Sequence, residues 1–221
     1  MEYLSRSLLP ADVCAELQSR LSASNLPWLD GRLSAGEQAA MVKKNRQLDP
    51  AERLTAEITS VVSDALRTDP LIKSFCLIRK VHSVLVSRCD VGDAYGWHVD
   101  NPFTSHGRRD LSFTVFLSDD SDYDGGQLEI QTSDKNTEYV LPIGHVLIYP
   151  SSMLHRVVQV TRGTRFACVG WIESYVRSIE DRSILFGLDA GARGLLARHG
   201  RSDELDLIFQ SYTNAIRRLS D

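Results

Sequence analysis

The chain has 221 residues, of which 43% are hydrophobic, and its 29 acidic residues outnumber its 25 lysines and arginines to give a formal net charge of −4. This size and composition predict one large globular domain or a core with a helical appendage, and the acidic balance argues against nucleic acid as a partner, because proteins that bind nucleic acid usually carry a basic face. No apolar run approaches the roughly 18 residues that span a bilayer, and the first residues lack the pattern of a secretion signal, so we expect a cytoplasmic protein without a membrane partner.

Helical patterns dominate the N-terminal third of the chain. The segment 10–21 carries apolar residues at helical spacing, and residues 28–45 mix glycines and basic residues in what we expect to be a surface loop. A second helix is predicted to open with Asp49 as its N-cap and Pro50 in its first turn, and to end at the next Asp-Pro pair. Residues 1–75 are therefore predicted to form an N-terminal helical support region.

The apolar period changes toward two from residue 72, which is typical of strands. Short strand-like runs, in which we include Cys76, alternate with turn signals such as Asp124-Gly125-Gly126. Residues 76–175 are therefore predicted to form an antiparallel sandwich or jelly-roll core. With helices packed outside the strands, the fold class is α+β.

Helical spacing returns in residues 176–221, where two amphipathic stripes predict a C-terminal helical region. These helices either brace the sheet or join two subunits as a homodimer. Core packing is the commoner use of such a stripe, and the sequence does not choose between the two.

The four cysteines, Cys14, Cys76, Cys89 and Cys168, are scattered and form no Cys-x-x-Cys pair. This spacing argues against a structural zinc site and against a disulfide framework. Reduced thiols in a reducing compartment are the simpler interpretation.

His98 and Asp100 are spaced two residues apart, so on an extended strand both side chains leave the same face. With His155 as a third ligand they would make the two-histidine, one-carboxylate triad of non-haem Fe(II) oxygenases. A lone His-x-Asp is a frequent chance match, and a solvated surface pair is the alternative. Tyr95 and Trp97 have the opposite parity to His98, so we expect both to face away from the metal and to serve in packing.

Arg165 shares its strand parity with Ala167, Val169 and Trp171. If that row faces the core, it buries a cation, which is costly unless an anion pairs with it. A dicarboxylate that binds a metal at one end could supply this anion, because the guanidinium fork suits a carboxylate. The alternative is an ion pair with Glu173 or another acidic residue of the chain, Asp110.

These residues resemble the 2-oxoglutarate/Fe(II) dioxygenases, and specifically the bacterial PKHD-type hydroxylases related to prolyl hydroxylases. The resemblance rests on His98-x-Asp100, His155 and Arg165, and extends to segments such as 30–36, 123–128 and 161–165, so that it covers nearly the whole chain. It implies a double-stranded β-helix, with the dioxygenase core in residues 76–175. One position departs from the family, because relatives usually carry a 2-oxoglutarate-contacting Tyr where this chain has Cys89.

The resemblance also implies the cofactors and the reaction. Fe(II) would be held by His98, Asp100 and His155, and the co-substrate 2-oxoglutarate would reach Arg165 with its distal carboxylate. The expected reaction hydroxylates an unactivated C–H of an amino-acid-like, peptidyl or small-metabolite substrate, with release of succinate and CO2. L-Ascorbate (vitamin C) is a further family expectation. The presence of Asp100 argues against a halogenase, which needs that metal position free for halide.

Three other functions stay open from the sequence. A nucleic-acid demethylase would use the same iron chemistry, but it predicts a basic groove, and the acidic balance is against it. A non-catalytic jelly-roll sensor would bind metal without consuming a co-substrate, and an inward-facing Arg165 weighs against it. A purely structural sandwich would bind no metal.

Overall fold

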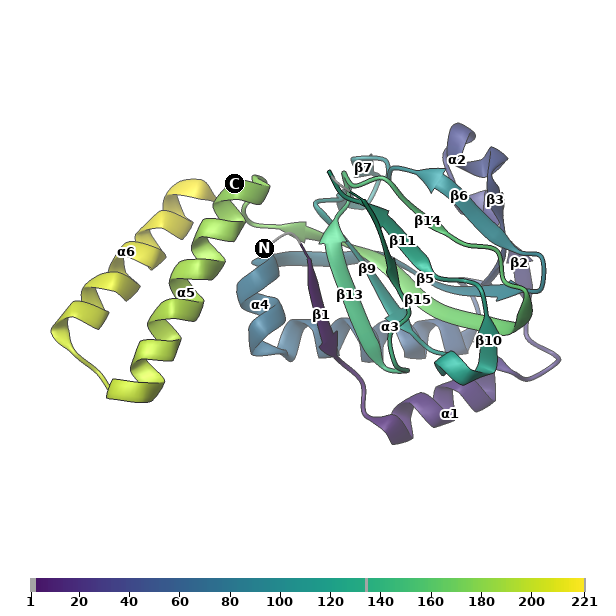
Figure 1. The fold of residues 1–221 in the computed structure, drawn as a ribbon, viewed down its shortest axis with the longest axis horizontal. Coiled ribbons are helices and arrows are strands. Elements are labelled where there is room, and N and C mark those ends of the chain that lie inside the picture. Colours follow the sequence, from purple (N-terminus) through teal and green to yellow (C-terminus); the bar gives the residue numbers. More distant parts are fainter. Residues whose placement is uncertain (1–2, 134, 221) are drawn as a thin grey trace.

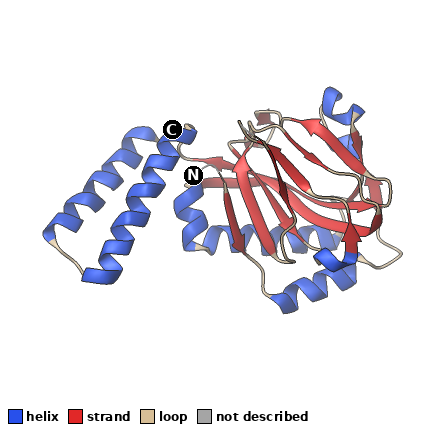
Figure 2. Ribbon diagram, viewed as in Figure 1, coloured by secondary structure: helices blue, strands red, loops and turns tan. Residues whose placement is uncertain are grey.

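The computed structural model describes residues 3–133 and 135–220, in which two antiparallel sheets face each other (Figures 1 and 2). The larger sheet has the spatial order β1 (Leu4–Ser7), β13 (His145–Pro150), β9 (Leu111–Phe116), β15 (Arg162–Ser174), β5 (Ile78–Asp90), β4 (Arg46–Leu48) and β2 (Trp28–Asp30), and β10 (Tyr123–Asp124) pairs with β15. The smaller sheet has the order β12 (Asn136–Tyr139), β11 (Leu128–Gln131), β14 (His155–Val157), β6 (Ala94–His98) and β3 (Lys43–Lys44). A short ribbon joins β7 (Phe103–Thr104) to β8 (Gly107–Arg108).

Helices pack outside these sheets, as predicted for an α+β jelly roll. They are α1 (Ala11–Leu21), α2 (Glu37–Met41), α3 (Arg53–Thr68), α4 (Pro70–Cys76), α5 (Ile179–His199) and α6 (Asp203–Leu219), with 3-10 turns at η1 (Gly31–Ser34) and η2 (Asp120–Asp122). In Figure 1, α3 runs along the outer face of the larger sheet, and α1 lies near it. The N-terminal region, predicted as helical support, also supplies strands to both sheets, and the division at residues 75 and 175 stays a prediction.

Alternation along β15 divides its side chains between two environments. Phe166 and Cys168 belong to the core under the helices, whereas Arg165, Val169 and Trp171 line a cavity between the two sheets. Successive side chains of a strand leave opposite faces, and both faces of this sheet are covered. The row of Arg165, Val169 and Trp171 thus shares one face of the strand, as alternation predicts, and the structure shows that this face lines the cavity.

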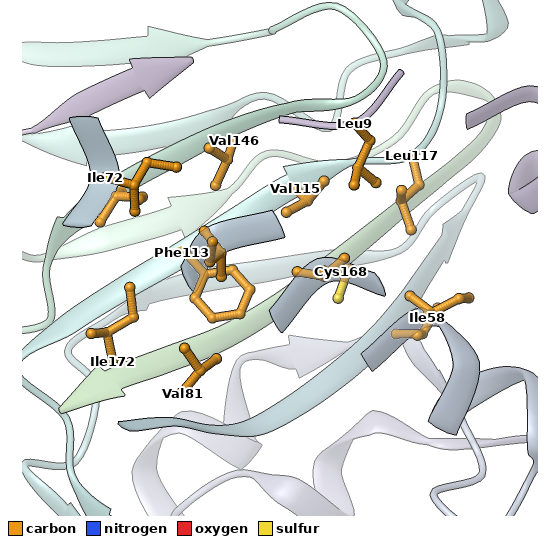
Figure 3. Close-up of a cluster of buried hydrophobic side chains, with 14 of the residues drawn as sticks. Leu9, Ile58, Ile72, Val81, Phe113, Val115, Leu117, Val146, Cys168 and Ile172 are labelled. Atoms are coloured by element: carbon orange, nitrogen blue, oxygen red, sulfur yellow. The ribbon is translucent and has the colours of Figure 1, made fainter. Parts of the chain in front are cut away.

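The main core lies between the larger sheet and α3. Figure 3 shows Ile58 of α3 and Val115 of β9 in this cluster, together with Cys168 of β15. Ile58 and Val115 are both fully buried, and α3 contacts β5 and β15. Burial of this apolar stripe positions the strands whose other face lines the cavity.

Replacement of Ile58 by Ala is expected to lower the free energy of unfolding by about 2 to 5 kcal/mol, because it leaves a cavity in a packed core. Urea denaturation followed by circular dichroism measures this change. Val61→Ala on the same helix is the control, since Val61 is 39% exposed and should change the free energy by less than about 1 kcal/mol. Equal effects of the two variants would contradict this packing of α3.

Two predictions near the first long helices are wrong. The helix α3 begins at Arg53 with Glu52 as its N-cap, not at Asp49, because the Asp49 carboxylate instead accepts a hydrogen bond from the Ala51 amide and closes a local turn. Cys76 lies in α4 rather than in a strand. Asp69 caps α4 by accepting hydrogen bonds from two amides of its first turn, so the Asp-Pro pair that ends α3 also starts a new helix.

The helices α5 and α6 form a hairpin that projects to one side of the sheets (Figure 1). It joins the body through α4, where the Phe75 and Phe186 ring centroids lie 5.5 Å apart and the Ser74 hydroxyl donates to Asp189 at 2.6 Å. Large apolar side chains such as Ile184 and Leu207 stay exposed on this hairpin. The homodimer stays a prediction. No helix in the described ranges is both long enough and apolar enough to span a bilayer.

Candidate active site

Two residues that are close in the sequence, His98 and Asp100, meet a distant third, His155, in the cavity between the sheets. His98 ends β6 and His155 begins β14, and the two are register partners on adjacent strands. Asp100 follows β6 by two residues. One ligand atom from each of the three lies within 4.8 Å of the others, and His155 Nε2 is 3.8 Å from Asp100 Oδ2. The structure thus brings together the three predicted metal ligands.

Backbone carbonyls fix the orientation of both imidazoles. His98 Nδ1 lies 2.8 Å from the Gly96 carbonyl oxygen, and His155 Nδ1 lies 2.9 Å from the Met153 carbonyl oxygen. A carbonyl only accepts, so Nδ1 carries a proton in each ring, and in a neutral imidazole the lone pair is then on Nε2. Nε2 is therefore the nitrogen of each ring that would bind a metal.

Asp100 is held by two donors from the larger sheet. The Ser112 hydroxyl donates to Asp100 Oδ2 at 2.6 Å, and the Trp171 indole donates to the same oxygen at 2.9 Å. Ser112 also shares a hydrogen bond of 2.8 Å with Ser151. Hydrogen bonds to a carboxylate restrict its rotation, and hydrogen bonds of this kind fix the orientation of a metal ligand.

Burial keeps the histidine at the end of β6 neutral. Burial is the largest cause that holds the pKa of His98 well below its usual range, and the neighbouring His155 lowers it further. Because a proton competes with a metal for the same nitrogen, a low pKa leaves the imidazole free for metal binding at neutral pH.

Arg165 lies in the same cavity and is only 3% exposed. Its guanidinium carbon is 5.5 Å from the Phe116 ring centroid, and its Nε has no hydrogen-bond partner in the described part of the chain. Neither Glu173 nor Asp110 pairs with it, because both carboxylates lie against Arg108 instead. The intramolecular ion pair considered from the sequence is therefore excluded for these two acids.

Cys89 lies directly opposite Arg165 in the register of β5 and β15, and it also lines the cavity. Burial raises the pKa of its thiol, while the charge of Arg165 lowers it. Tyr123 approaches the same corner, since a Cβ on Gly126 would touch both Arg165 and the Tyr123 ring. The pKa of Tyr123 is raised by burial and lowered by Arg165. A thiol and a phenol thus flank the guanidinium.

The prediction that Tyr95 faces away from the metal ligands is wrong. Its ring stacks on His98 with centroids 3.6 Å apart, and it lines the cavity. On β14 the pairing advances two residues, from His155 to Val157, while on β6 it spans three, from His98 to Tyr95. This extra residue is a β-bulge, which reverses the local parity. Trp97 does not line the cavity, and its ring lies 4.8 Å from the Arg156 guanidinium.

The segment 28–45, predicted as a surface loop, also contributes to the cavity. Lys43 and Asn45 are each only 8% exposed and line its wall, and Asn45 donates to Ser87 at 2.8 Å. Sequence analysis missed these residues and Arg109, because they lie on short strands or loops without a readable period. Further lining residues are Gln47, Leu85, Ser112, Thr114, Leu128, Tyr149, Val157 and Val169.

Comparison with known sequences identifies the family of this chain. Residues 84–173, which contain the His-Asp-His group and Arg165, match the 2OG-Fe(II) oxygenase superfamily. The chain is 67% identical to a PKHD-type hydroxylase of Synechococcus sp. (strain CC9605), with both chains covered completely. It is 60% identical to a PKHD-type hydroxylase of Synechococcus sp. (strain CC9902), with 100% of this chain and 99% of that relative covered.

Solved structures share the fold at low sequence identity. A prolyl-4-hydroxylase from Pseudomonas putida matches with a TM-score of 0.52 and 19% identity, over 78% of this chain and 92% of its own. A prolyl hydroxylase from Trichoplax adhaerens, solved with a peptide fragment of the hypoxia inducible factor oxygen degradation domain, matches with a TM-score of 0.57 and 18% identity, over 83% and 86%. With the jelly roll, the His-Asp-His group and the full-length sequence identity taken together, the chain belongs to the PKHD-type hydroxylases, enzymes of the 2OG-Fe(II) oxygenase superfamily.

Proposed function

We propose that this enzyme hydroxylates an unactivated C–H of an amino-acid-like, peptidyl or small-metabolite substrate, with release of succinate and CO2. In this proposal Fe(II) binds to His98, Asp100 and His155, and 2-oxoglutarate binds to Arg165. The observation that carries it is that one cavity is lined by three converging ligand atoms and by a buried guanidinium that has no acidic partner in residues 3–133 and 135–220.

The donor set fits Fe(II). Two neutral imidazole nitrogens and one carboxylate oxygen are the ligands of non-haem Fe(II) oxygenases, and they leave coordination positions for other molecules. The two histidine rings donate hydrogen bonds to the Gly96 and Met153 carbonyls, and Asp100 accepts hydrogen bonds from Ser112 and Trp171. These contacts support the assignment, because they hold each metal ligand in its orientation.

Arg165 fits a dicarboxylate. A cation that is only 3% exposed is costly unless an anion accompanies it, and the Arg165 Nε, which has no hydrogen-bond partner among the described residues, is a ready donor. A carboxylate offers two oxygens in the plane that matches the guanidinium fork. The distal carboxylate of 2-oxoglutarate supplies this anion when the other end of the molecule reaches the metal.

When bound, Fe(II) would supply the oxidising chemistry with O2 as the oxidant: one oxygen atom of O2 would enter the substrate C–H bond as hydroxyl, and the other would enter 2-oxoglutarate as it loses CO2 and becomes succinate. The residues of the chain perform the other tasks. Arg165 fixes the far end of the co-substrate, and Ser112 and Trp171 keep Asp100 in place. Apolar walls from Leu128, Val157 and Val169 exclude water from the cavity. L-Ascorbate is proposed only as an added reductant, as the family resemblance implies.

The test is a substrate screen that measures succinate formation with Fe(II), 2-oxoglutarate and oxygen. We expect succinate formation that requires both Fe(II) and 2-oxoglutarate and that rises when the correct substrate is present. Parallel assays with and without L-ascorbate show whether a reductant is needed. Metal binding without any 2-oxoglutarate consumption would instead support a non-catalytic sensor.

Cys89→Tyr is expected to change the affinity for 2-oxoglutarate, because a phenol at this position would enter the corner beside Arg165. Titration of the Fe(II)-loaded protein with 2-oxoglutarate in the absence of oxygen measures the change. Cys89→Phe is the matched control, since it adds the ring without the hydroxyl and separates hydrogen bonding from bulk. An unchanged affinity in both variants would mean that residue 89 does not contact the co-substrate.

A further inference from the structure

Two more cations line the cavity in addition to Arg165. Lys43 projects from β3, and its ammonium donates to the Ser34 hydroxyl at 3.1 Å and lies 4.9 Å from the Tyr95 ring centroid. The Arg109 guanidinium stacks on Trp171 with its carbon 3.7 Å from the ring centroid. In the described ranges, neither side chain forms an ion pair with a carboxylate, and the buried Nε of Arg109 has no hydrogen-bond partner.

When the charges in the proposed complex are added, the positive charges of Lys43 and Arg109 are not balanced by its negative groups. In the proposed complex, Asp100 and the two carboxylates of 2-oxoglutarate carry three negative charges, and Fe(II) and Arg165 carry three positive charges. Those groups balance one another, and the histidines are neutral. Among the described residues, Lys43 and Arg109 therefore remain in the cavity without counter-charge. Lys43 is 8% exposed and Arg109 is half-buried, and burial of an unpaired cation is unfavourable.

The pKa of Lys43 reflects the same environment. Burial lowers it to about 8, with Asp100 raising it and Arg109 lowering it. Both Asp100 and Arg109 are therefore close enough to act on the ammonium. An anion bound between the two cations would stabilise both charged side chains.

In the proposed complex the co-substrate leaves no carboxylate for these two cations. One of its carboxylates pairs with Arg165, and the other end of the molecule binds the metal. Arg109 lies near the metal ligands, because it stacks on Trp171, whose indole donates a hydrogen bond to Asp100. Balancing the charges of Lys43 and Arg109 therefore requires a second anion on the metal side of the cavity.

We propose that the primary substrate carries a free carboxylate, which Lys43 and Arg109 bind on the metal side of the cavity. This inference rests on the proposed function. It favours an amino-acid-like acid or the C-terminal residue of a peptide over an internal residue of a chain, because an internal residue brings only a neutral amide to the two cations.

The experiment uses the protein loaded with Fe(II) and 2-oxoglutarate without oxygen, and measures binding by isothermal titration calorimetry. The probes are the twenty L-amino acids and their primary amides, each with and without an N-acetyl cap. The uncapped acids represent free amino acids, and the capped acids represent a peptide C-terminus. We expect at least one acid to bind about tenfold or more tightly than its amide, since a hydrogen bond to a charged group is stronger than one to a neutral group.

Variants test whether the two cations cause the preference for an acid over its amide. Lys43→Met and Arg109→Met should each reduce it, while Lys43→Arg should retain it because the charge remains. Lys44→Met is the matched control: Lys44 is the next residue on β3, but its side chain is 70% exposed and pairs with Asp93 at 3.5 Å. Thermal unfolding of each variant shows that the fold is kept.

Several outcomes would overturn the carboxylate proposal: no acid binds better than its amide, or the preference survives in both methionine variants. A weaker affinity of Lys43→Met for 2-oxoglutarate would also overturn it, because Lys43 would then serve the co-substrate. If the wild-type protein binds no 2-oxoglutarate with Fe(II), the proposed function itself fails. That result is distinct, because it appears before any probe is added.

Discussion

Asp100→Ala is expected to abolish Fe(II)-dependent conversion of 2-oxoglutarate to succinate while the protein stays folded. The variant removes the only carboxylate of the metal-binding group described above, and two histidines alone leave the metal without its anionic ligand. Succinate formation and anaerobic Fe(II) binding measure the effect. Both should fall to background.

The fold of this variant should survive because Asp100 lies at the cavity and not in the core under the helices. Loss of the carboxylate leaves the Trp171 indole and the Ser112 hydroxyl without this acceptor, a cost of about 1 to 3 kcal/mol if water does not replace it. Asp203→Ala, an exposed acid at the start of α6, is the control and should change neither measurement. Succinate formation that persists in Asp100→Ala would refute the ligand role.

Arg165→Ala should raise the 2-oxoglutarate concentration required for half-maximal turnover by roughly 30-fold or more. Removing one partner of a buried, hydrogen-bonded charge pair typically costs about 2 to 5 kcal/mol, and the co-substrate carboxylate would lose its counter-ion. Steady-state succinate formation across a range of 2-oxoglutarate concentrations measures the shift, and anaerobic titration gives the affinity directly.

The control for this prediction is on the same strand. Arg162 lies three residues before Arg165 on β15, but its side chain is 55% exposed and pairs with Asp124 at 2.6 Å. Arg162→Ala should therefore leave the 2-oxoglutarate requirement unchanged. An equal requirement in wild type and Arg165→Ala would remove the argument that this guanidinium pairs with the co-substrate.

Local periodicity predicted the parts of the site that lie on regular strands. The common face of Arg165, Val169 and Trp171 on β15 follows from alternation alone, because successive side chains of an extended chain leave opposite faces. The same rule failed at Tyr95, where the extra residue of the bulge between β6 and β14 reverses the parity. A bulge is a property of the pairing of two strands, and a single-strand pattern does not contain it.

Helix signals were similarly ambiguous when taken locally. Asp49-Pro50 and Asp69-Pro70 carry the same dipeptide, yet only Asp69 caps a helix, and Asp49 closes a turn before α3 begins. The difference depends on where Leu54 and Ile58 must lie to reach the core, because burial of an apolar face contributes more than one cap. Tertiary packing therefore set the start of α3.

By itself, the sequence determined which residue types were available and which of them share a strand face. It supplied the His-x-Asp pair, the arginine in an inward row and the alternation of strands that predicts a jelly roll. Only the tertiary structure decided that β14 pairs with β6, so that His155 lies beside His98, and that β3 places Lys43 inside the cavity. These pairings join segments far apart in the chain, and their register depends on mutual packing and hydrogen bonding rather than on any local period.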